Sequence, residues 1–129
     1  MELIRLLSQV RYEVIQGTVH TRVEGVTNDT RDLRRGDAYV CIEGYGTDGH
    51  RFVPEAVEKG AAAIVASKEI ACPPGVTVIR VADTRWALAA MSAAACGYPA
   101  EHLRVIGITG TKGKTTTAWM LRDILAREE

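Results

Sequence analysis

Apolar residues recur at helical spacing over the first ten positions and then alternate loosely with polar ones. The recurring residues, which predict a helix over Glu2–Val10, are Leu3, Leu6, Leu7 and Val10. The alternation over Thr18–Val26 predicts a strand. We therefore expect the chain to open with a small helix and a strand.

Two short apolar runs in the middle of the chain, Ala38–Ile42 and Ala61–Ala66, predict buried strands, and Val76–Val81, which follows the Pro73-Pro74-Gly75 turn, predicts another strand. A helix is expected before the second run, because Pro54 suits a first turn and Gly60 a position just beyond the last one. Strands that alternate with helices favour an α/β fold with parallel pairing, at least in the middle. The predicted fold is a small Rossmann-like sheet layered with helices.

A longer helix is predicted from Thr84 to about Cys96, with Asp83 as its N-cap and Gly97 beyond its end. The stretch Ala87–Ala95 is apolar on nearly every side, so we expect this helix to lie between two layers. Trp86 precedes that stretch directly and is expected in the core.

The chain closes with a predicted strand at Leu103–Thr109 and a predicted helix at Lys114–Arg127, in which Trp119 is also expected in the core. The polar stretch Tyr98–His102 is the best candidate for a domain linker. One strand and one helix cannot form a sheet layer of their own. We therefore expect the chain to be the front part of a longer protein.

Composition excludes several classes of function. The 129 residues are 47% apolar, which suits a packed domain, and 16 basic residues balance 16 acidic ones. No overall positive field is available for a nucleic acid or an anionic membrane. We also find no apolar run long enough to span a bilayer and no signal peptide over Met1–Val10, so we expect a cytoplasmic protein. The three cysteines are widely spaced and are expected to be buried free thiols.

The segment ITGTKGKTTT, residues 108–117, places two glycines, two lysines and five threonines between the last predicted strand and the last predicted helix. Such a turn directs backbone N–H groups and the positive end of the helix toward one point, where anions bind. Lys114 has the length to reach β and γ phosphates, and the hydroxyl of Thr115 can hold Mg²⁺. The strict phosphate-loop pattern is not met, since Ile108 stands where its first glycine would be, and the match is to the shorter form G-T-x-G-K-T. The sequence predicts an ATP-type phosphate site.

The stretch GITGTKGKTTT, Gly107–Thr117, resembles the ATP loop of the Mur ligases, the amide-forming enzymes of peptidoglycan precursor synthesis. Upstream, TNDTRDLRRGDAYVCIEGYGTDGHRFVPEAVEKGAAAIV, Thr27–Val65, resembles the N-terminal domain of the same family. The two motifs occur in the family's order, and together the resemblance covers most of the chain. It is strongest to the branch that contains the UDP-N-acetylmuramoyl-tripeptide synthetases.

This resemblance implies a domain organisation and an activity. Residues 1–98 would form the N-terminal domain that binds the UDP-sugar substrate, and residues 99–129 the truncated start of the ATP-binding central domain: its first strand, P-loop and helix. The implied reaction adds a diamino acid to UDP-N-acetylmuramoyl-L-alanyl-D-glutamate, after ATP has converted the carboxylate into an acyl phosphate. The C-terminal domains of the same chain would complete the enzyme, so we expect this part alone to be inactive.

The resemblance also implies site residues. Its ATP-binding stretch corresponds to Gly110, Thr111, Lys112, Gly113, Lys114, Thr115 and Thr116, with Lys114 and Thr115 in catalytic roles and Thr115 on the Mg²⁺ ion. Lys112 departs from the asparagine that is commoner in the family and adds a cation beside the phosphates. The implied contacts to the sugar nucleotide are Asn28, Thr30, Tyr45, Gly46 and Thr47.

Alternatives stay open at this point. Without the resemblance, the NDTR segment reads better as an Asx turn in which Asp29 and Arg31 brace each other. The scattered histidines His20, His50 and His102 argue against a zinc site. The D-Ala-D-Ala-adding branch of the family and a non-catalytic sugar-nucleotide-binding module remain as rival functions.

Overall fold

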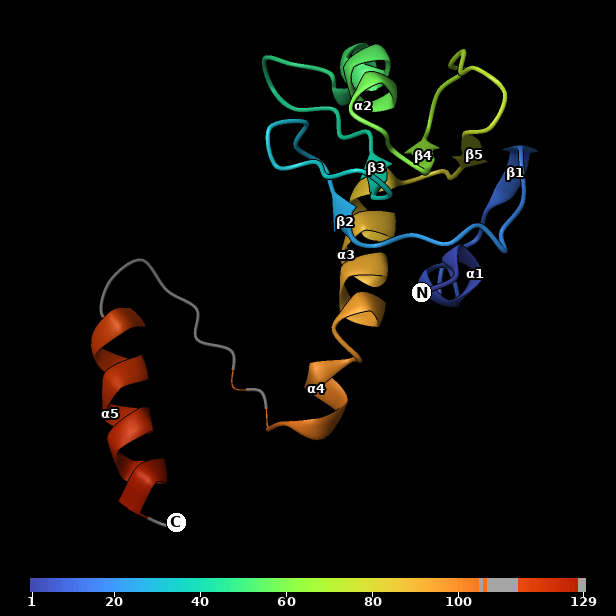
Figure 1. The fold of residues 1–129 in the computed structure, drawn as a ribbon. Helices are drawn as coiled ribbons and strands as arrows, with labels where there is room; N and C mark the ends of the chain where they lie inside the picture. The colour runs from blue at the N-terminus through green and yellow to red at the C-terminus, as the bar shows by residue number, and fades with distance from the viewer. Residues whose placement is uncertain (105, 107–113, 128–129) are drawn as a thin grey trace. The chain divides into compact units, whose positions relative to one another are not determined.

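The structure is a computed structural model that describes residues 1–104, 106 and 114–127. The chain divides into two compact units, Met1–Pro99 and Ala100–Glu129. Each unit is described by itself below. The first holds the sheet and most of the helices, and the second holds the last long helix (Figure 1).

The first unit is built on a five-stranded sheet with the order β1-β5-β4-β3-β2. The strands are β1 (Glu13–Gln16), β2 (Val26–Thr27), β3 (Ala38–Val40), β4 (Ala63–Ala66) and β5 (Thr77–Arg80). The four strands from β2 to β5 pair in parallel, and only β1 is antiparallel, against β5. The predicted α/β class and the predicted parallel pairing are confirmed.

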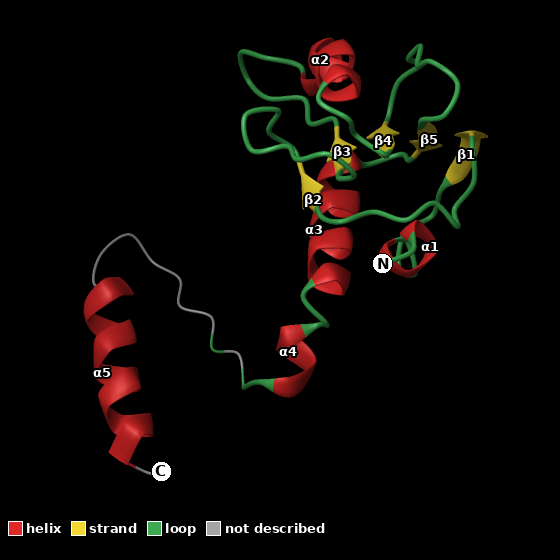
Figure 2. Ribbon diagram, in the orientation of Figure 1, coloured by secondary structure: helices red, strands yellow, loops and turns green. Residues whose placement is uncertain are grey.

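Helices lie on both faces of this sheet, with α2 on one side and α1 and α3 on the other (Figure 2). The helices of the first unit are α1 (Leu3–Leu6), the 3-10 helix η1 (Gly49–Phe52), α2 (Val53–Glu58) and α3 (Thr84–Ala95). The short α4 (Pro99–His102) follows α3 where the predicted linker lies, and α5 (Lys114–Arg127) has the predicted bounds.

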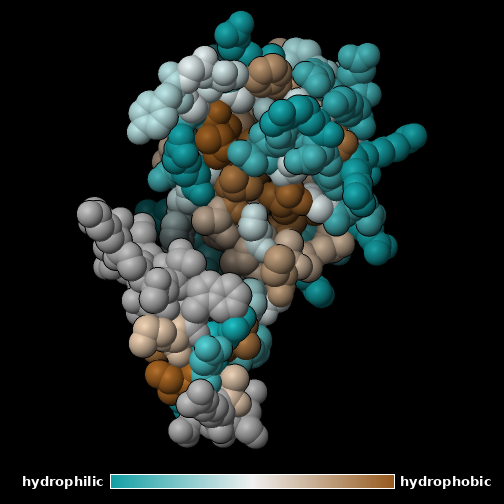
Figure 3. Space-filling view, turned by 90° about the vertical axis from the view of Figure 1, so that its left-hand side faces the viewer, coloured by the Kyte–Doolittle hydropathy of each residue, from teal (hydrophilic) through white to brown (hydrophobic). Residues whose placement is uncertain are grey.

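The alternation of side chains along β4 divides the interior into two cores. Ala63 and Val65 belong to the core under α1 and α3, whereas Ile64 and Ala66 belong to the core under α2. All four are buried, which explains why the sequence here is a continuous apolar run instead of an alternating one. On the face of the first unit shown in Figure 3, hydrophilic side chains lie mainly toward the outside, and hydrophobic ones gather between them near the middle.

The N-terminal segment differs from the prediction. The helix ends at Leu6 instead of Val10, although Leu7 and Val10 still join the core. No strand spans Thr18–Val26, because the backbone carbonyls of Val19 and Thr21 accept hydrogen bonds from the first N–H groups of α1. The strand that precedes this segment, β1, was not predicted.

The environment of α3 is also different from the prediction. Asp83 does cap the helix, since its Oδ1 accepts from the N–H groups of Arg85 and Trp86 at 3.0 and 3.1 Å. One side of α3 is buried, but Ala89 and Ala95 are exposed, so the helix covers one face of the sheet and is not enclosed. Trp86 is 58% exposed, and its prediction as a core residue was wrong.

The burial predicted for the cysteines is confirmed for Cys41 alone, and another prediction falls largely outside the described residues. The cysteines are free, as expected, but Cys96 is exposed and Cys72 half-buried, and only Cys41 is buried. Most of the strand predicted at Leu103–Thr109, and the side chain of Trp119, lie outside the described residues.

Candidate functional site

Two connections, one after β2 and one after β3, carry the residues that were predicted to contact the sugar nucleotide. Because β2 and β3 are neighbours and parallel, both connections leave the same edge of the sheet. Ligands of open α/β sheets bind at this carboxyl edge. Asn28 and Thr30 lie in the first connection, and Tyr45, Gly46 and Thr47 in the second. No hydrogen bond between described residues joins the two groups directly.

The turn after β2 is braced by its own side chains. Asp29 Oδ1 accepts from the N–H of Arg31 at 2.9 Å, and the Arg31 guanidinium donates to both oxygens of the same carboxylate, at 2.7 Å from Nη2 to Oδ2. These hydrogen bonds lower the pKa of Asp29 to about 2. The Asx turn considered as an alternative is therefore present. It leaves Asn28 exposed and Thr30 buried at 8% exposure.

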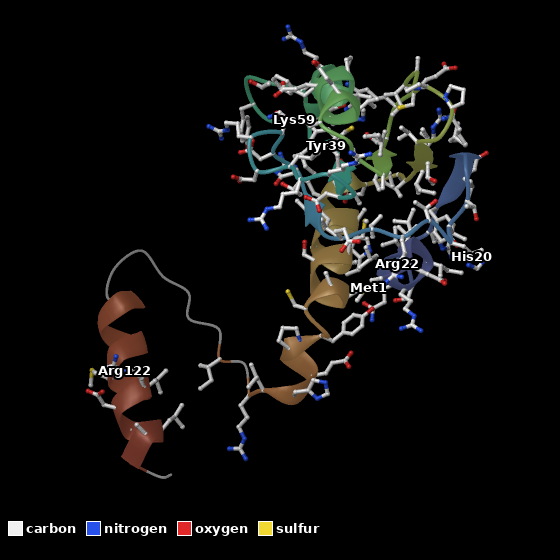
Figure 4. The ribbon with its side chains drawn as sticks, viewed as in Figure 1. Met1, His20, Arg22, Tyr39, Lys59 and Arg122 are labelled. Atoms are coloured by element: carbon white, nitrogen blue, oxygen red, sulfur yellow. The ribbon has the colours of Figure 1, made fainter. Side chains whose placement is uncertain are left out.

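Lys59 links this turn to the body of the domain, and Tyr39 links β3 to the start of η1. Lys59, at the end of α2, donates from Nζ to the carbonyl of Thr30 at 2.6 Å. Tyr39 on β3 donates from its hydroxyl to the carbonyl of Gly49 at 2.9 Å. Both side chains are labelled in Figure 4, on the α2 side of the sheet. Burial, and then neighbouring acidic groups that include Asp29, raise the pKa of Tyr39 to about 12, so its hydroxyl stays protonated.

The connection after β3, residues 43–48, is a short hairpin that we call the β3 loop. Glu43 and Asp48 face each other in an isolated antiparallel bridge at its base. Within it, the N–H of Gly44 donates to the carbonyl of Thr47 at 2.8 Å and closes a tight turn. Tyr45 at the tip is fully exposed. The loop thus presents an aromatic ring and the backbone of Gly46 to solvent.

A network of charged side chains surrounds the base of the β3 loop. Lys68, just beyond β4, donates from Nζ to Asp48 Oδ2 at 2.7 Å and also pairs with Oε1 of Glu43 at 2.5 Å. The hydrogen bond from Lys68, followed by those from His50, holds the pKa of Asp48 well below its usual range. The pKa of Lys68 is raised to about 12, chiefly by its hydrogen bond to Asp48.

His50 has both ring nitrogens engaged. Its Nε2 accepts from the backbone N–H of Ser67 at 3.1 Å, so Nδ1 must carry the proton that is shared with Asp48 Oδ1 at 2.6 Å. This fixes the tautomer of a side chain that is only 7% exposed. His50 therefore ties the β3 loop to the end of β4.

Arg85 adds a link to α3. Its Nη2 donates to the carbonyl of Glu43 at 2.7 Å, from the first turn of the helix. Since Asp83 already caps that turn, the N-terminal N–H groups of Arg85 and Trp86 are occupied. The carboxyl ends of β3, β4 and β5 are therefore joined through side chains at one place.

Glu43, Asp48 and His50 offer three ligand atoms within 4.8 Å of one another, a spacing that could hold a metal ion. The ammonium of Lys68 already lies against both carboxylates, and His50 has no ring nitrogen to spare. The cluster is thus satisfied by the protein's own cation.

The predicted ATP loop falls largely outside the described residues. Gly110, Thr111, Lys112 and Gly113 are not described, nor are the side chains of Lys114, Thr115 and Thr116. The backbone of these last three residues forms the first turn of α5, a helix of 14 residues.

Lys59, Lys68 and Arg85 were not singled out from the sequence. Each contacts a loop from at least 20 positions away along the chain. One signal was available, since Lys68 follows a buried strand directly and so lies at the same sheet edge as the other site residues.

The comparison with family models matches residues 22–95 to the Mur ligase family, catalytic domain. Among curated proteins, UDP-N-acetylmuramoyl-L-alanyl-D-glutamate--2,6-diaminopimelate ligase of Clostridium perfringens is 42% identical over 98% of this chain and 26% of its own length. The protein of the same name from Alkaliphilus metalliredigens is 40% identical over 100% of this chain and 26% of its own. The chain spans about a quarter of the length of the curated relatives it matches.

Solved structures give the same family. A UDP-N-acetylmuramoylalanyl-D-glutamyl-2,6-diaminopimelate--D-alanyl-D-alanyl ligase from Acinetobacter baumannii matches 98% of this chain and 28% of its own, with a TM-score of 0.69 and 30% identity. A MurF ligase from Thermotoga maritima, solved in complex with ADP, matches 75% of this chain and 21% of its own, with a TM-score of 0.58 and 31% identity.

The described helices include none with the length and apolar content that a membrane crossing requires. The family model covers more than half of the chain, and it takes in both connections of the candidate site. The family inferred from the two sequence motifs is confirmed: this chain belongs to the Mur ligase family.

Proposed function

We propose that the chain binds the sugar nucleotide, and contributes the ATP loop, in a ligase that adds a diamino acid to UDP-N-acetylmuramoyl-L-alanyl-D-glutamate. The observation that carries this proposal is the match of nearly the whole chain, at 40% and 42% identity, to relatives named for that reaction with 2,6-diaminopimelate. We therefore propose 2,6-diaminopimelate as the amino acid. The activity belongs to a protein that also has the remaining domains.

The carboxyl edge of β2 and β3 supports the assignment of the sugar-nucleotide site. Tyr45 offers an exposed ring for packing on a base or a sugar, and the amide of Gly46 is open to an oxygen of the diphosphate. Asn28 and Thr30 would supply polar contacts from the neighbouring connection. Since hydrogen bonds and ion pairs already hold both connections in the free chain, little further ordering of their backbone would be needed when a ligand binds.

ATP and Mg²⁺ are proposed for residues 110–116. Their chemistry fits a triphosphate, because glycines, lysines and threonine hydroxyls directly precede and begin a helix of 14 residues. When bound, ATP supplies the phosphoryl group that activates the substrate carboxylate. Lys114 would hold β and γ phosphate oxygens, Thr115 would hold the metal, and the backbone of Gly110–Gly113 would surround the phosphates.

We further propose residues 1–98 as the sugar-nucleotide domain and residues 99–129 as the start of the ATP-binding domain. The division of the structure at Pro99 and Ala100 lies beside this boundary. The proposal assigns no catalytic turnover to the 129-residue chain alone.

Calorimetric titration of the chain tests this function. UDP-N-acetylmuramoyl-L-alanyl-D-glutamate should bind, and Tyr45→Ala should weaken binding by about tenfold, the loss typical of a stacked ring. Tyr12→Ala is the matched control, since Tyr12 is an exposed tyrosine outside both connections. Tight binding of Mg-ATP with no response to any uridine nucleotide would overturn the assignment.

The D-Ala-D-Ala-adding branch is the second candidate, because the similar solved structures include ligases of that branch. Those structures are 30–32% identical, below the 40% and 42% of the diaminopimelate ligases. An activity assay of the longer protein with 2,6-diaminopimelate, L-lysine or D-Ala-D-Ala would separate the branches. Product with D-Ala-D-Ala alone would reverse our choice.

A further inference from the structure

The β3 loop is fixed by hydrogen bonds and ion pairs at its base and is exposed to solvent at its tip. Two backbone hydrogen bonds close it, from Gly44 to Thr47 at 2.8 Å and from Gly49 to Ile42 at 2.7 Å. Beyond them, the side chains of Tyr45 and Thr47 make no hydrogen bond to a described residue. An exposed tip of this kind keeps one arrangement only if its base is fixed.

We propose that Lys68 is a positioning residue, which holds the two ends of the β3 loop together so that Tyr45, Gly46 and Thr47 meet the uridine diphosphate part of the ligand in one arrangement. This role rests on the proposed function, because it presumes that the loop contacts a uridine nucleotide. It assigns to Lys68 no contact with the ligand itself.

The first argument is electrostatic. Glu43 and Asp48 pair across the base of the hairpin, where two carboxylates at directly opposed positions repel each other. The single ammonium of Lys68 contacts both carboxylates and replaces that repulsion with two ion pairs. Removing it would leave two like charges facing each other across the base of the loop.

The second argument is the position of Lys68 in the fold, just beyond the end of the buried central strand β4. Lys68 follows β4, whose residues are all buried, and it lies 20 positions along the chain from Asp48. Its neighbour Ser67 donates its backbone N–H to His50, whose other ring nitrogen is bonded to Asp48. The β3 loop is thus attached to the rigid centre of the sheet and not only to itself.

Arg85 provides the third attachment, from α3 to the carbonyl of Glu43. Unlike Lys68, Arg85 binds the backbone on one side of the hairpin and forms no ion pair with the carboxylate of Glu43 or Asp48. Lys68 is therefore the residue whose loss should loosen the loop while the remaining contacts preserve the fold.

The test compares the 129-residue chain with Lys68→Met, Lys68→Arg and Arg5→Met. Arg5→Met removes one positive charge from α1, which makes no hydrogen bond to the β3 loop in the described part of the chain. Two quantities are measured: the affinity for uridine diphosphate by calorimetry, and the ¹⁵N heteronuclear NOE of the amides of residues 44–47. Thermal melts define a temperature at which all variants are folded.

We expect Lys68→Met to lower both the NOE of residues 44–47 and the affinity, the latter by about tenfold, which corresponds to ordering the backbone of a single residue on binding. Lys68→Arg should retain most of the affinity, and Arg5→Met all of it. Unchanged affinity in Lys68→Met, with normal binding by the parent chain, would overturn the positioning role and leave the proposed function standing. Lost affinity with an unchanged NOE would also overturn it, because Lys68 would then contact the ligand. Absence of binding by the parent chain would instead refute the proposed function, and this role with it.

Discussion

The hydroxyl of Tyr98 lies 2.8 Å from Oγ of Ser8, and this hydrogen bond joins the residue beyond α3 to the segment beyond α1. Tyr98 has a φ of 54°, the one positive value among described residues other than glycine. Such a conformation costs about 1–2 kcal/mol for an L-residue. The hydrogen bond and the packing of the ring against the core offset that cost.

Tyr98→Phe should therefore lower the free energy of unfolding by about 1 kcal/mol, the usual contribution of one hydrogen bond. Ser8→Ala should have a similar effect. The double variant should be no less stable than either single one, since both changes remove the same bond. Urea denaturation measures all three, and additive losses would show that the two hydroxyls act independently.

Asp83→Ala should destabilise the first turn of α3. The carboxylate accepts from two backbone N–H groups, and loss of an N-cap costs about 1 kcal/mol. Asp83→Asn keeps an acceptor and should stay within a few tenths of a kcal/mol of the parent chain. Thermal unfolding followed by circular dichroism distinguishes them, and equal losses in both variants would indicate that charge, and not capping, matters.

Gly49→Ala should be strongly destabilising. A Cβ at Gly49 would lie 2.7 Å from the backbone nitrogen of Ile42 and 2.9 Å from its carbonyl oxygen, so the backbone itself would have to move. We expect a loss of about 1–3 kcal/mol, as for other overpacked sites.

Gly46→Ala is the matched control, because a Cβ there meets nothing within 4 Å. Its stability should stay within about 0.5 kcal/mol of the parent chain. Equal stability of the two alanine variants would show that the close contact at Gly49 is relieved without strain.

The titration of Asp48 should depend on Lys68. Because the pKa of Asp48 is lowered in the folded protein, its hydrogen bonds stabilise the fold above the ordinary carboxyl range near about pH 4, and this contribution is lost as the pH falls through the lowered value. In Lys68→Met the largest cause of the lowering is absent, so the pKa should rise and the loss should begin at higher pH.

Carboxyl ¹³C shifts recorded from about pH 6 to about pH 2 follow Asp48 directly. Asp29, whose pKa is lowered by Arg31 and not by Lys68, serves as the internal control. If the Asp48 carboxyl of Lys68→Met stays as fully ionised as that of the parent chain down to about pH 2, its pairing with Lys68 is not maintained in solution.

The elements of the first unit were predictable where local signals agreed with packing. Asp83 marks the start of α3 by its capping side chain, Pro54 and Gly60 mark the ends of α2 by their backbone geometry, and the buried strands β3 and β4 appear as continuous apolar runs. The strand β1 was missed because Glu13, Val14 and Ile15 are all exposed on a sheet edge, where burial imposes no alternation.

Trp86 shows a second reason why the sequence pattern did not predict burial correctly. Its neighbour Ala87 is buried, and one residue rotates the side chain by about 100° around a helix, enough to carry it from the core to solvent. The apolar composition of α3 fixed neither which side faces the sheet nor whether a second layer covers the other side.

Of the candidate site, the residues at loop tips were predictable and their supports were not. Tyr45 and Gly46 lie in a recognisable motif, whereas Lys68 and Arg85 reach the β3 loop from the ends of other elements. Only the parallel order of β3, β4 and β5 brings these positions to one edge.

The attachment of the β3 loop to other elements by ion pairs and hydrogen bonds has a consequence for engineering. A hairpin held only by its own strand could be exchanged between relatives as a unit, but the β3 loop is also anchored from two distant stretches of the chain, one at Ser67 and Lys68 and one at Arg85. A graft of residues 43–48 into another scaffold would arrive without its ammonium and its guanidinium. Transfer of the loop in its present arrangement would therefore require His50, Ser67, Lys68 and Arg85 to be transferred with it.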